Sequence, residues 1–334
     1  MLIAVVAALA SIPTRGEGAA VPAVRADLHL DTPSQVLLES LALDAQDGLE
    51  AGVPRLEEGG TNLAVMVLWP GGRGVSHRTR TFALLERMEA EITRLDGVHL
   101  VRSPADARRV AARGELGVLF ALEGAHGLGA DWRGDLAELH ERGLAMLGLT
   151  WSTSNRFAGS SGDGGGGLTE DGRLLIREAQ RLGMLVDLSH ASDATAREVC
   201  LGSPVPVVAS HSGARAVLDH PRNLSDSLIR CIAESGGVVG LNLHGPFLRA
   251  AGADAAAAAR HATHLREVGG PGVVALGSDY DGWIKTPTDL PHAGALPLLW
   301  RAMAEAGLSD DDIRAARGEN FLRAWERAQT SARP

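Results

Sequence analysis

The sequence predicts an α/β fold, a (β/α)8 barrel of the TIM type. Two observations favour it: short apolar runs rich in β-branched residues recur along the chain, and amphipathic helical patterns lie between them. Eight such units in 334 residues give roughly 40 residues per unit, which is within the usual size of this barrel. A doubly wound open sheet is the alternative that the same alternation allows.

Eight segments fit buried parallel strands. Most of them are nearly continuous apolar runs, which is what a parallel strand needs when both faces of its sheet are covered. Their length and their β-branched content favour strands over buried helices. The eight segments are Val24–Asp31, Leu63–Trp69, Gly117–Glu123, Ala145–Trp151, Met184–His190, Val205–His211, Gly237–Leu243 and Val273–Asp279.

Four of the intervening segments carry helical signals. Phe82–Leu95 has apolar residues at close to helical spacing. Leu168–Leu182 begins with a Thr-Glu-Asp cap and ends at a glycine, Gly183. Ser225–Ser235 runs into a Gly-Gly pair, and Ser309–Arg317 begins Ser-Asp-Asp-Asp, an acidic first turn that suits the helix dipole.

We expect residues 24–328 to form a single catalytic domain, because no composition break, proline-rich linker or internal repeat divides this range. Residues 1–23 are either a signal peptide or a disordered tail. Leu2–Ala10 is apolar and of signal-peptide length, but no basic residues precede it and it is too short to cross a bilayer. Location therefore stays open between export to the periplasm and the cytoplasm, and we expect no membrane span.

The composition excludes several classes of function. Hydrophobic residues make up 45% of the chain, and the net charge of −9 argues against nucleic-acid binding through a broad basic field. Lys285 is the only lysine, which removes most lysine chemistry. Cys200 and Cys231 are too few for a disulfide scaffold. Gly162–Gly167 satisfies G-x-G-x-x-G, but about ten residues separate it from the preceding strand, so it does not fit a dinucleotide-binding turn.

Ionisable side chains gather where the predicted strands end. The carboxyl ends of barrel strands share one face, so these side chains should converge there. Burying them together without a cation would be destabilising, since an unpaired buried charge costs several kcal/mol. The sequence therefore predicts a divalent metal centre. The residues are His29, Asp31, Glu123, His190, His211 and Asp279.

The donor set favours two zinc ions. His29 and Asp31 are two residues apart, so both side chains point to the same face of a strand and can share one ion. Histidines combined with carboxylates suit Zn²⁺ best, although Mn²⁺, Co²⁺ or Fe²⁺ also fit. Two metals need a bridging anion, and Glu123 is the natural bridge because Lys285 lies outside every strand end.

An ordered set of motifs resembles the membrane (renal-type) dipeptidase family, the M19 metallopeptidases among the amidohydrolase-like barrels. Most of these motifs are weak singly, but they run in family order from near residue 25 to near residue 325. The matching stretches are Asp27–Asp31, Leu122–His126, Leu149–Asn155, Val186–His190, Ser210–Ser212, His220–Asn223, Gly277–Gly282 and Gly318–Arg323.

The resemblance implies a metal-dependent hydrolase barrel with two zinc ions per chain. His29 and Asp31 would hold one zinc, His190 and His211 the other, and Glu123 would bridge them. A hydroxide shared by the two metals would then attack the peptide bond of a dipeptide. The resemblance also implies a homodimer.

The same resemblance assigns roles in substrate binding and proton transfer. Arg222 would clamp the free C-terminal carboxylate of the dipeptide, because a guanidinium can bind it through two parallel hydrogen bonds. Asp279 would act as general base and then as general acid. Asp281, the second acid of its motif, is expected to be structural.

One position departs from the family pattern. Trp151 stands where family members such as the renal enzyme carry a histidine thought to contact the scissile carbonyl, and an indole N–H cannot carry positive charge. His244 could substitute for it or could be an ordinary loop residue. His126 either orients Glu123 or caps a turn, and Asn155 is expected to shape its loop.

Two other functions stay open on the sequence. One is a different metal-dependent amidohydrolase that acts on lactones, cyclic amides or N-acyl amino acids, although such enzymes usually show His-x-His on the first strand. The other is a metal-loaded protein that binds dipeptides without turnover, which Trp151 makes conceivable. A serine hydrolase has no G-x-S-x-G motif to support it.

Overall fold

The computed structural model describes residues 23–332. The apolar run Leu2–Ala10, for which a signal peptide is one interpretation, lies outside these residues. Between residues 23 and 332, no helix is both long enough and apolar enough to span a bilayer.

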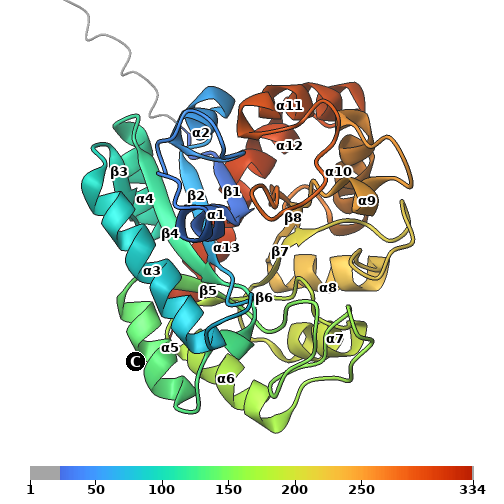
Figure 1. Ribbon diagram of the computed structural model, residues 1–334. Helices are drawn as coiled ribbons and strands as arrows, with labels where there is room; N and C mark the ends of the chain where they lie inside the picture. Colours follow the sequence, from blue (N-terminus) through green and yellow to red (C-terminus); the bar gives the residue numbers. More distant parts are fainter. Residues whose placement is uncertain (1–22, 333–334) are drawn as a thin grey trace, which may run out of the picture.

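Eight parallel strands form a central ring that helices surround (Figure 1). The strands pair in the order β1-β2-β4-β5-β6-β7-β8-β9. Backbone hydrogen bonds close the ring, because Asp31 N donates to Tyr280 O at 2.9 Å and Asp279 N to His29 O at 3.0 Å. The strands are β1 Ala26–Leu30, β2 Leu63–Leu68, β4 Leu116–Leu122, β5 Leu144–Gly148, β6 Leu185–Asp187, β7 Val207–Ser212, β8 Val239–Leu241 and β9 Val274–Leu276.

The barrel prediction is therefore confirmed, and the closed ring rejects an open doubly wound sheet. Each predicted strand segment overlaps one ring strand, and the ends differ by one to a few residues. A ninth strand, β3 Val98–Leu100, was missed. It pairs with the start of β4, and its three residues with a central histidine give too little apolar signal to read.

Most of the helices follow strands and lie outside the ring (Figure 1). Those before β6 are α1 Thr32–Leu38, α2 Val53–Gly59, α3 His77–Arg94, α4 Pro104–Ala112, the short 3₁₀ helix η1 Ala125–Gly127, α5 Trp132–Glu141 and α6 Glu170–Arg181. Those after β6 are α7 Asp193–Gly202, α8 Asp226–Ser235, α9 Gly245–Leu248, α10 Ala255–Gly269, η2 Ala293–Ala295, α11 Leu296–Glu305, α12 Asp310–Arg314, the π-helix η3 Ala315–Glu319 and α13 Asn320–Thr330.

The four predicted helices correspond to α3, α6, α8 and α12, and their caps explain where they begin. Thr169 caps α6 by accepting a hydrogen bond from Gly172 N, and Ser225 caps α8 by accepting one from Leu228 N. Ser309 and the third acidic residue of α12 form a reciprocal capping box. The predicted starts of α6, α8 and α12 are therefore confirmed, whereas α3 begins at His77, five residues before the predicted Phe82, with Ser76 as its cap.

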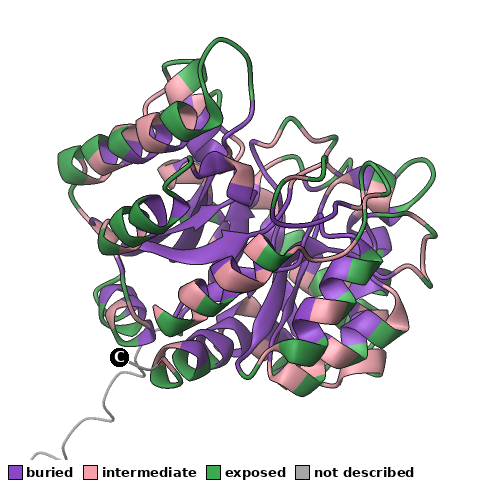
Figure 2. Cartoon of the chain, turned by 90° about the horizontal axis from the view of Figure 1, so that it is seen from below, coloured by how far each residue is buried: buried purple, intermediate pink, exposed green. Residues whose placement is uncertain are grey.

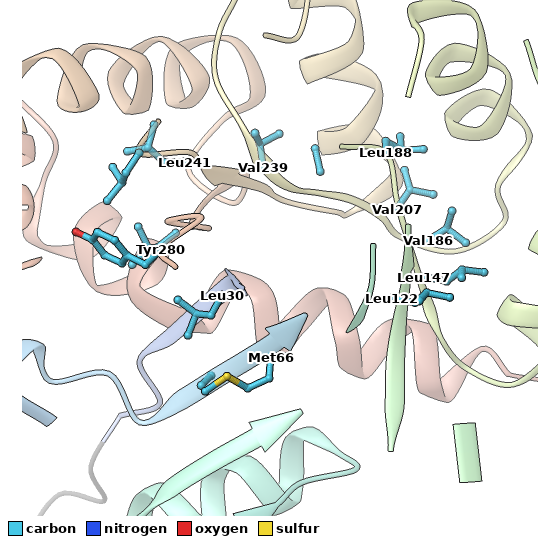
Figure 3. Close-up of a cluster of buried hydrophobic side chains, with 14 of the residues drawn as sticks. Leu30, Met66, Leu122, Leu147, Val186, Leu188, Val207, Val239, Leu241 and Tyr280 are labelled. Carbon is cyan, nitrogen blue, oxygen red and sulfur yellow. The ribbon is translucent and has the colours of Figure 1, made fainter. Parts of the chain in front are cut away.

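The hydrophobic core has two parts, which follow from the alternation of side chains along a strand. Leu30, Met66 and Leu122 belong to a large cluster that also contains helix residues, so this part lies between the ring and the helices (Figure 3). The intervening residues, such as Val65 and Leu119, form a second cluster with α13 and fill the ring. The eight ring strands are buried throughout, and exposed residues lie on the outer faces of the helices and in loops (Figure 2).

The two cysteines, too few for a scaffold, form one disulfide bond. Cys200 in α7 and Cys231 in α8 are 31 residues apart in sequence and 6.1 Å apart between Cα atoms. The bond links two consecutive outer helices.

Candidate metal centre

The six ionisable side chains predicted at strand ends lie together at the carboxyl end of the ring. β1 and β7 contribute one histidine each, and the other residues directly or closely follow β1, β4, β6 and β9. None is more than 9% exposed. The residues are His29, Asp31, Glu123, His190, His211 and Asp279.

His29 faces three carboxylates. Its Nε2 atom lies 3.5 Å from Glu123 Oε1, 3.6 Å from Asp31 Oδ2 and 3.9 Å from Asp279 Oδ1. Ligand atoms of His29, Asp31 and Asp279 all lie within 4.8 Å of one another, so they could share one metal ion.

A second group of ligand atoms lies near the same oxygen of Glu123. Glu123 Oε1 lies 3.0 Å from His190 Nε2 and 3.6 Å from His211 Nε2, and these two ring nitrogens are 2.9 Å apart. His29, Glu123 and His211 also have ligand atoms within 4.8 Å of one another. One oxygen of Glu123 therefore lies within 3.6 Å of three histidine nitrogens.

Two histidines of the site, His190 and His211, have lowered pKa values. Burial, the Arg222 charge and His29 lower the pKa of His190 to about 4, in spite of Glu123. Burial together with the neighbouring cations lowers the pKa of His211 well below its usual value. Both rings are therefore neutral at physiological pH and offer lone pairs to a metal.

The pKa values of His29 and the carboxylates shift in different directions. Burial alone lowers the pKa of His29, but Glu123 and Asp31 raise it well above the usual value. Burial raises the pKa of Glu123, but the stronger opposing effect of His29 and His190 sets it well below its usual value. Burial, with the charge of Glu123, raises the pKa of Asp31 to about 6, and burial raises that of Asp279 well above 3.8. A proton on His29 thus takes the place that a cation would fill.

The donor atoms fit a divalent metal. His29 Nε2 is buried and has no hydrogen-bond partner among the described residues, although it faces the carboxylates. Imidazole nitrogens and carboxylate oxygens are borderline and hard donors of the kind that Zn²⁺, Mn²⁺, Co²⁺ and Fe²⁺ accept. A cation bound here would satisfy the orphan nitrogen and neutralise the buried acids.

A single hydroxyl supports two of the histidines. Ser210 Oγ lies 3.1 Å from His29 Nδ1 and 2.8 Å from His211 Nδ1, and it donates to Asp187 Oδ2 at 2.5 Å. Because its one proton goes to Asp187, both imidazoles must donate their Nδ1 protons to the hydroxyl oxygen. This arrangement directs the Nε2 atoms of both rings toward Glu123, where a bound metal could replace the proton on His29.

Two site residues have unusual backbone conformations. His190 and Asp279 have positive φ angles of 65° and 70°. A non-glycine residue in this region is uncommon and costs on the order of 1 to 3 kcal/mol, which the surrounding structure must offset. Here the strain turns both side chains inward at the point where their strands have ended.

Arg222 lies in the loop after β7 and is buried beside the acidic cluster. Its Nη2 donates to His211 O at 3.2 Å, and its guanidinium carbon lies 5.6 Å from the Phe247 ring centroid. Arg222 Nε has no hydrogen-bond partner among the described residues. Burial lowers the pKa of Arg222, but the group stays charged, so it offers a cation and free donors to an anion.

A cavity of about 300 Å³ is lined by residues of this cluster, with Arg222, Trp151 and His244 also in its wall. His244 Nδ1 accepts a hydrogen bond from Lys285 N at 3.0 Å, so its Nε2 carries the ring proton. Burial, Arg222 and His220 lower the pKa of His244 to about 4, which keeps the ring neutral.

Other predicted residues lie outside the cavity wall. His126, in η1, packs its ring edge-on to His77 with centroids 4.8 Å apart, and no hydrogen bond joins it to Glu123 in the part of the chain described here. Asn155 donates to Leu149 O at 2.8 Å and accepts from Phe157 N, so it shapes its loop.

Asp281 also belongs to the scaffold. Its carboxylate accepts hydrogen bonds from Thr32 Oγ1 at 2.7 Å and from Glu50 N at 2.7 Å. These contacts join the loop after β9 to the segment after β1, and so hold Asp279 in place.

Sequence reasoning missed several residues of the site. The cavity wall also contains Trp69, Trp283 and Phe247, and Asp187 supports the histidines through Ser210. Trp69 closes a predicted strand, so its position was a usable signal. Trp283 lies in a loop, where no periodic pattern places a side chain.

A closed parallel barrel with histidines and carboxylates at the carboxyl ends of its strands defines the class of metal-binding (β/α)8 barrels. Comparison with family models places the chain within this class. The family described as membrane dipeptidase, peptidase family M19, matches residues 20–334. The chain belongs to this family, which confirms the resemblance seen in its motifs and implies a metal cofactor.

Two dipeptidases are similar in sequence. Dipeptidase verJ of Clonostachys rogersoniana is 32% identical over 262 residues, covering 73% of this chain and 66% of that protein. Dipeptidase aclJ of Aspergillus oryzae is 36% identical over 216 residues, covering 63% of this chain and 51% of that protein. The matches therefore span between about half and two thirds of these relatives.

Solved structures are similar over nearly the whole barrel. A metallopeptidase from Rhodobacter sphaeroides, liganded with a phosphinate mimic of the dipeptide L-Ala-D-Ala, is 28% identical with a TM-score of 0.84, covering 92% of this chain and 99% of that one. The dipeptidase AC of family M19 is 29% identical with a TM-score of 0.83, covering 91% of this chain and 99% of that one.

Proposed function

We propose that this protein is a binuclear zinc dipeptidase that hydrolyses dipeptides with a free C-terminal carboxylate. One observation carries the proposal: a single Glu123 oxygen lies 3.0–3.6 Å from three histidine nitrogens, beside a buried arginine. Membership of the dipeptidase family supports the same activity. The structure of a relative liganded with a dipeptide mimic supports the substrate class.

The ligands divide into two sets that share Glu123. His29 and Asp31 would hold one zinc ion and His190 and His211 the other, and the donor distances and the Nε2 orientation support this division. When bound, the two ions would lower the pKa of a shared water and polarise the scissile carbonyl.

Asp279 would carry the proton. Asn242 Nδ2 donates to Asp279 Oδ2 at 3.0 Å, which fixes the carboxylate and leaves Oδ1 on the side of His29. Asp279 also lines the cavity. It would accept a proton from the attacking water and return it to the departing amine, first as general base and then as general acid.

Arg222 would bind the substrate carboxylate. Its guanidinium is already held by His211 O and by the Phe247 ring, so little conformational entropy is lost on binding. A bidentate arginine–carboxylate pair fixes direction as well as position. This contact would restrict the enzyme to short peptides with a free C-terminus.

His244 could supply the donor that Trp151 cannot. The neutral ring presents Nε2–H, because Nδ1 accepts from Lys285 N. Such a donor can stabilise negative charge on a carbonyl oxygen, and it does so best in a buried site. Trp151 contributes one indole N–H and an apolar face to the same wall.

The test combines metal analysis with hydrolysis assays on one sample. Protein stripped by chelator should lose hydrolysis of Ala-Ala and regain it with Zn²⁺, at about two ions per chain. Lactones and N-acyl amino acids in the same assay should be poor substrates. Three results would contradict the proposal. They are dipeptide hydrolysis that does not depend on metal, faster turnover of a lactone than of the dipeptide, and dipeptide binding without product over hours.

We also propose that residues 24–328 act as one catalytic domain and that the protein is a homodimer. Continuous packing between the ring and α13 supports the first statement, and family resemblance supports the second. Sedimentation equilibrium tests the dimer, since a mass of one chain at micromolar concentration would contradict it.

A further inference from the structure

We infer that the enzyme selects dipeptides whose N-terminal residue has a large apolar or aromatic side chain, an inference that rests on the proposed function. Three tryptophans absent from the proposed ligand set form one side of the cavity: Trp69, Trp151 and Trp283. We call them the tryptophan wall. Their chemistry offers a dipeptide a broad apolar surface.

The wall is a continuous surface. The rings of Trp69 and Trp151 have centroids 5.2 Å apart and meet edge to face, and Trp69 and Trp283 have centroids 5.7 Å apart. Trp69 thus joins two residues that come from distant loops, after β5 and after β9. Such pairs hold each other in place, so the wall is formed before a ligand arrives.

Trp69, the middle residue of the wall, lies across the ring from Arg222. In the strand order β1-β2-β4-β5-β6-β7-β8-β9, β2 and β7 are half a ring apart. Trp69 directly follows β2, and Arg222 lies in the loop after β7. A dipeptide anchored by its carboxylate at Arg222, with its peptide bond over Glu123, would therefore extend its N-terminal residue toward the wall.

Trp283 combines an exposed side chain with a strained backbone conformation. It is 55% exposed, which is unusual for so large an apolar side chain, and its φ of 53° is in the left-handed region. Exposed apolar area and backbone strain at a cavity mouth together indicate a surface that a ligand covers.

The wall determines the substrate class. Indole faces gain most from flat aromatic or branched aliphatic side chains, and little from glycine or alanine. We expect kcat/KM for Phe-Ala and Leu-Ala to exceed that for Gly-Ala by about tenfold.

Substitution of the exposed member tests the inference with little risk to folding. Trp283→Ala should lower kcat/KM for Phe-Ala by about fivefold and leave Gly-Ala nearly unchanged, and Trp283→Phe should restore most of the loss. Leu201→Ala, which removes another exposed apolar side chain far from the cavity wall, should change neither substrate.

A second series of dipeptides, in which the C-terminal residue varies, shows which side chain of the substrate contacts the wall. Ala-Gly, Ala-Leu and Ala-Phe should respond equally to Trp283→Ala. Three results would overturn the inference while leaving dipeptide hydrolysis in place. Trp283→Ala could change kcat/KM for this second series and not for the first, all N-terminal residues could give equal kcat/KM, or Lys-Ala could be preferred. No hydrolysis of any dipeptide by zinc-loaded protein would overturn the proposed function, and this inference with it.

Discussion

At the scale of single residues, Ser210 connects the two halves of the site. It accepts hydrogen bonds from the Nδ1–H groups of His29 and His211, one from each proposed ligand set, and donates a hydrogen bond to the buried Asp187. Outer contacts of this kind fix the tautomer and orientation of ligating histidines. Loss of one hydroxyl should therefore weaken both ligand sets at once.

Ser210→Ala should lower zinc affinity by roughly tenfold to a hundredfold. Competition with a chromophoric chelator measures this directly, without reference to turnover. Ser212→Ala is the matched control, because Ser212 Oγ lies 3.4 Å from Ser189 Oγ and has no hydrogen bond to either histidine ring among the described residues. Equal affinities for the two variants would contradict the role given to Ser210.

Arg222→Met should reduce kcat/KM for dipeptides by about a hundredfold, since a desolvated charge pair is lost. The C-terminal amide of the same dipeptide lacks the carboxylate, so its already low kcat/KM should change little. Steady-state kinetics on both substrates separates the two cases. An equal loss on acid and amide would show that Arg222 acts in another way.

Glu50 gives a pH dependence of stability. Burial raises the pKa of Glu50 from 4.5 to about 7, although it accepts a hydrogen bond from Asp281 N. The folded state therefore favours the protonated acid, so stability from this group is present below pH 4.5 and is lost as the pH rises toward 7. Glu50→Gln should flatten the fall of Tm over this interval relative to the wild type. Parallel Tm curves for the two proteins would contradict this assignment.

The residue types of the cluster were readable in the sequence, but the contacts among them were not. Histidines and acids at strand ends were predicted because strand ends are encoded locally by apolar runs. The meeting of Trp283 with Trp69 depends on the path of the loop after β9, and the support of His29 by Ser210 depends on the register between β1 and β7. Neither the path of the loop nor the register of the strands has a local signal in the sequence.

At the scale of elements, local chemistry located helix starts better than strand ends. Caps such as Ser225 act within one turn, so a short sequence window contains the whole signal. Strand ends depend on pairing with a neighbour, and β1 shows this in a register shift between Asp27 and Leu30. The strand β3 pairs with β4, and its three residues carry too little apolar signal to predict it without that partner.

The disulfide between α7 and α8 should stabilise the oxidised protein. It closes a loop across a sequence separation of 31 residues, and the chain-entropy estimate for such a loop is about 3 to 4 kcal/mol. The double variant Cys200→Ala, Cys231→Ala should lower the free energy of unfolding by this amount in denaturant titrations. Reduced wild-type protein is the control, and its free energy of unfolding should be lower than that of the oxidised protein by a similar amount. No difference between oxidised wild type and variant would contradict this expectation.

At the scale of the whole molecule, the barrel brings together residues that are distant in sequence. His29 and Asp279 come from opposite ends of the chain, and they are neighbours because β9 closes the ring on β1. Alternation along each strand sends one set of apolar side chains into the ring and the other toward the helices, and the polar residues of the site stand where the strands end. The closed barrel was predictable from eight repeating units, while the shape of the cavity, which the loops determine, was not.

We propose that two metal ions share Glu123, and anomalous diffraction from zinc-loaded crystals tests this proposal. We expect two peaks roughly 3.5–4 Å apart with the Glu123 carboxylate between them. One peak would be flanked by His29 and Asp31, and the other by His190 and His211. A single peak, or two peaks that do not both contact Glu123, would contradict it.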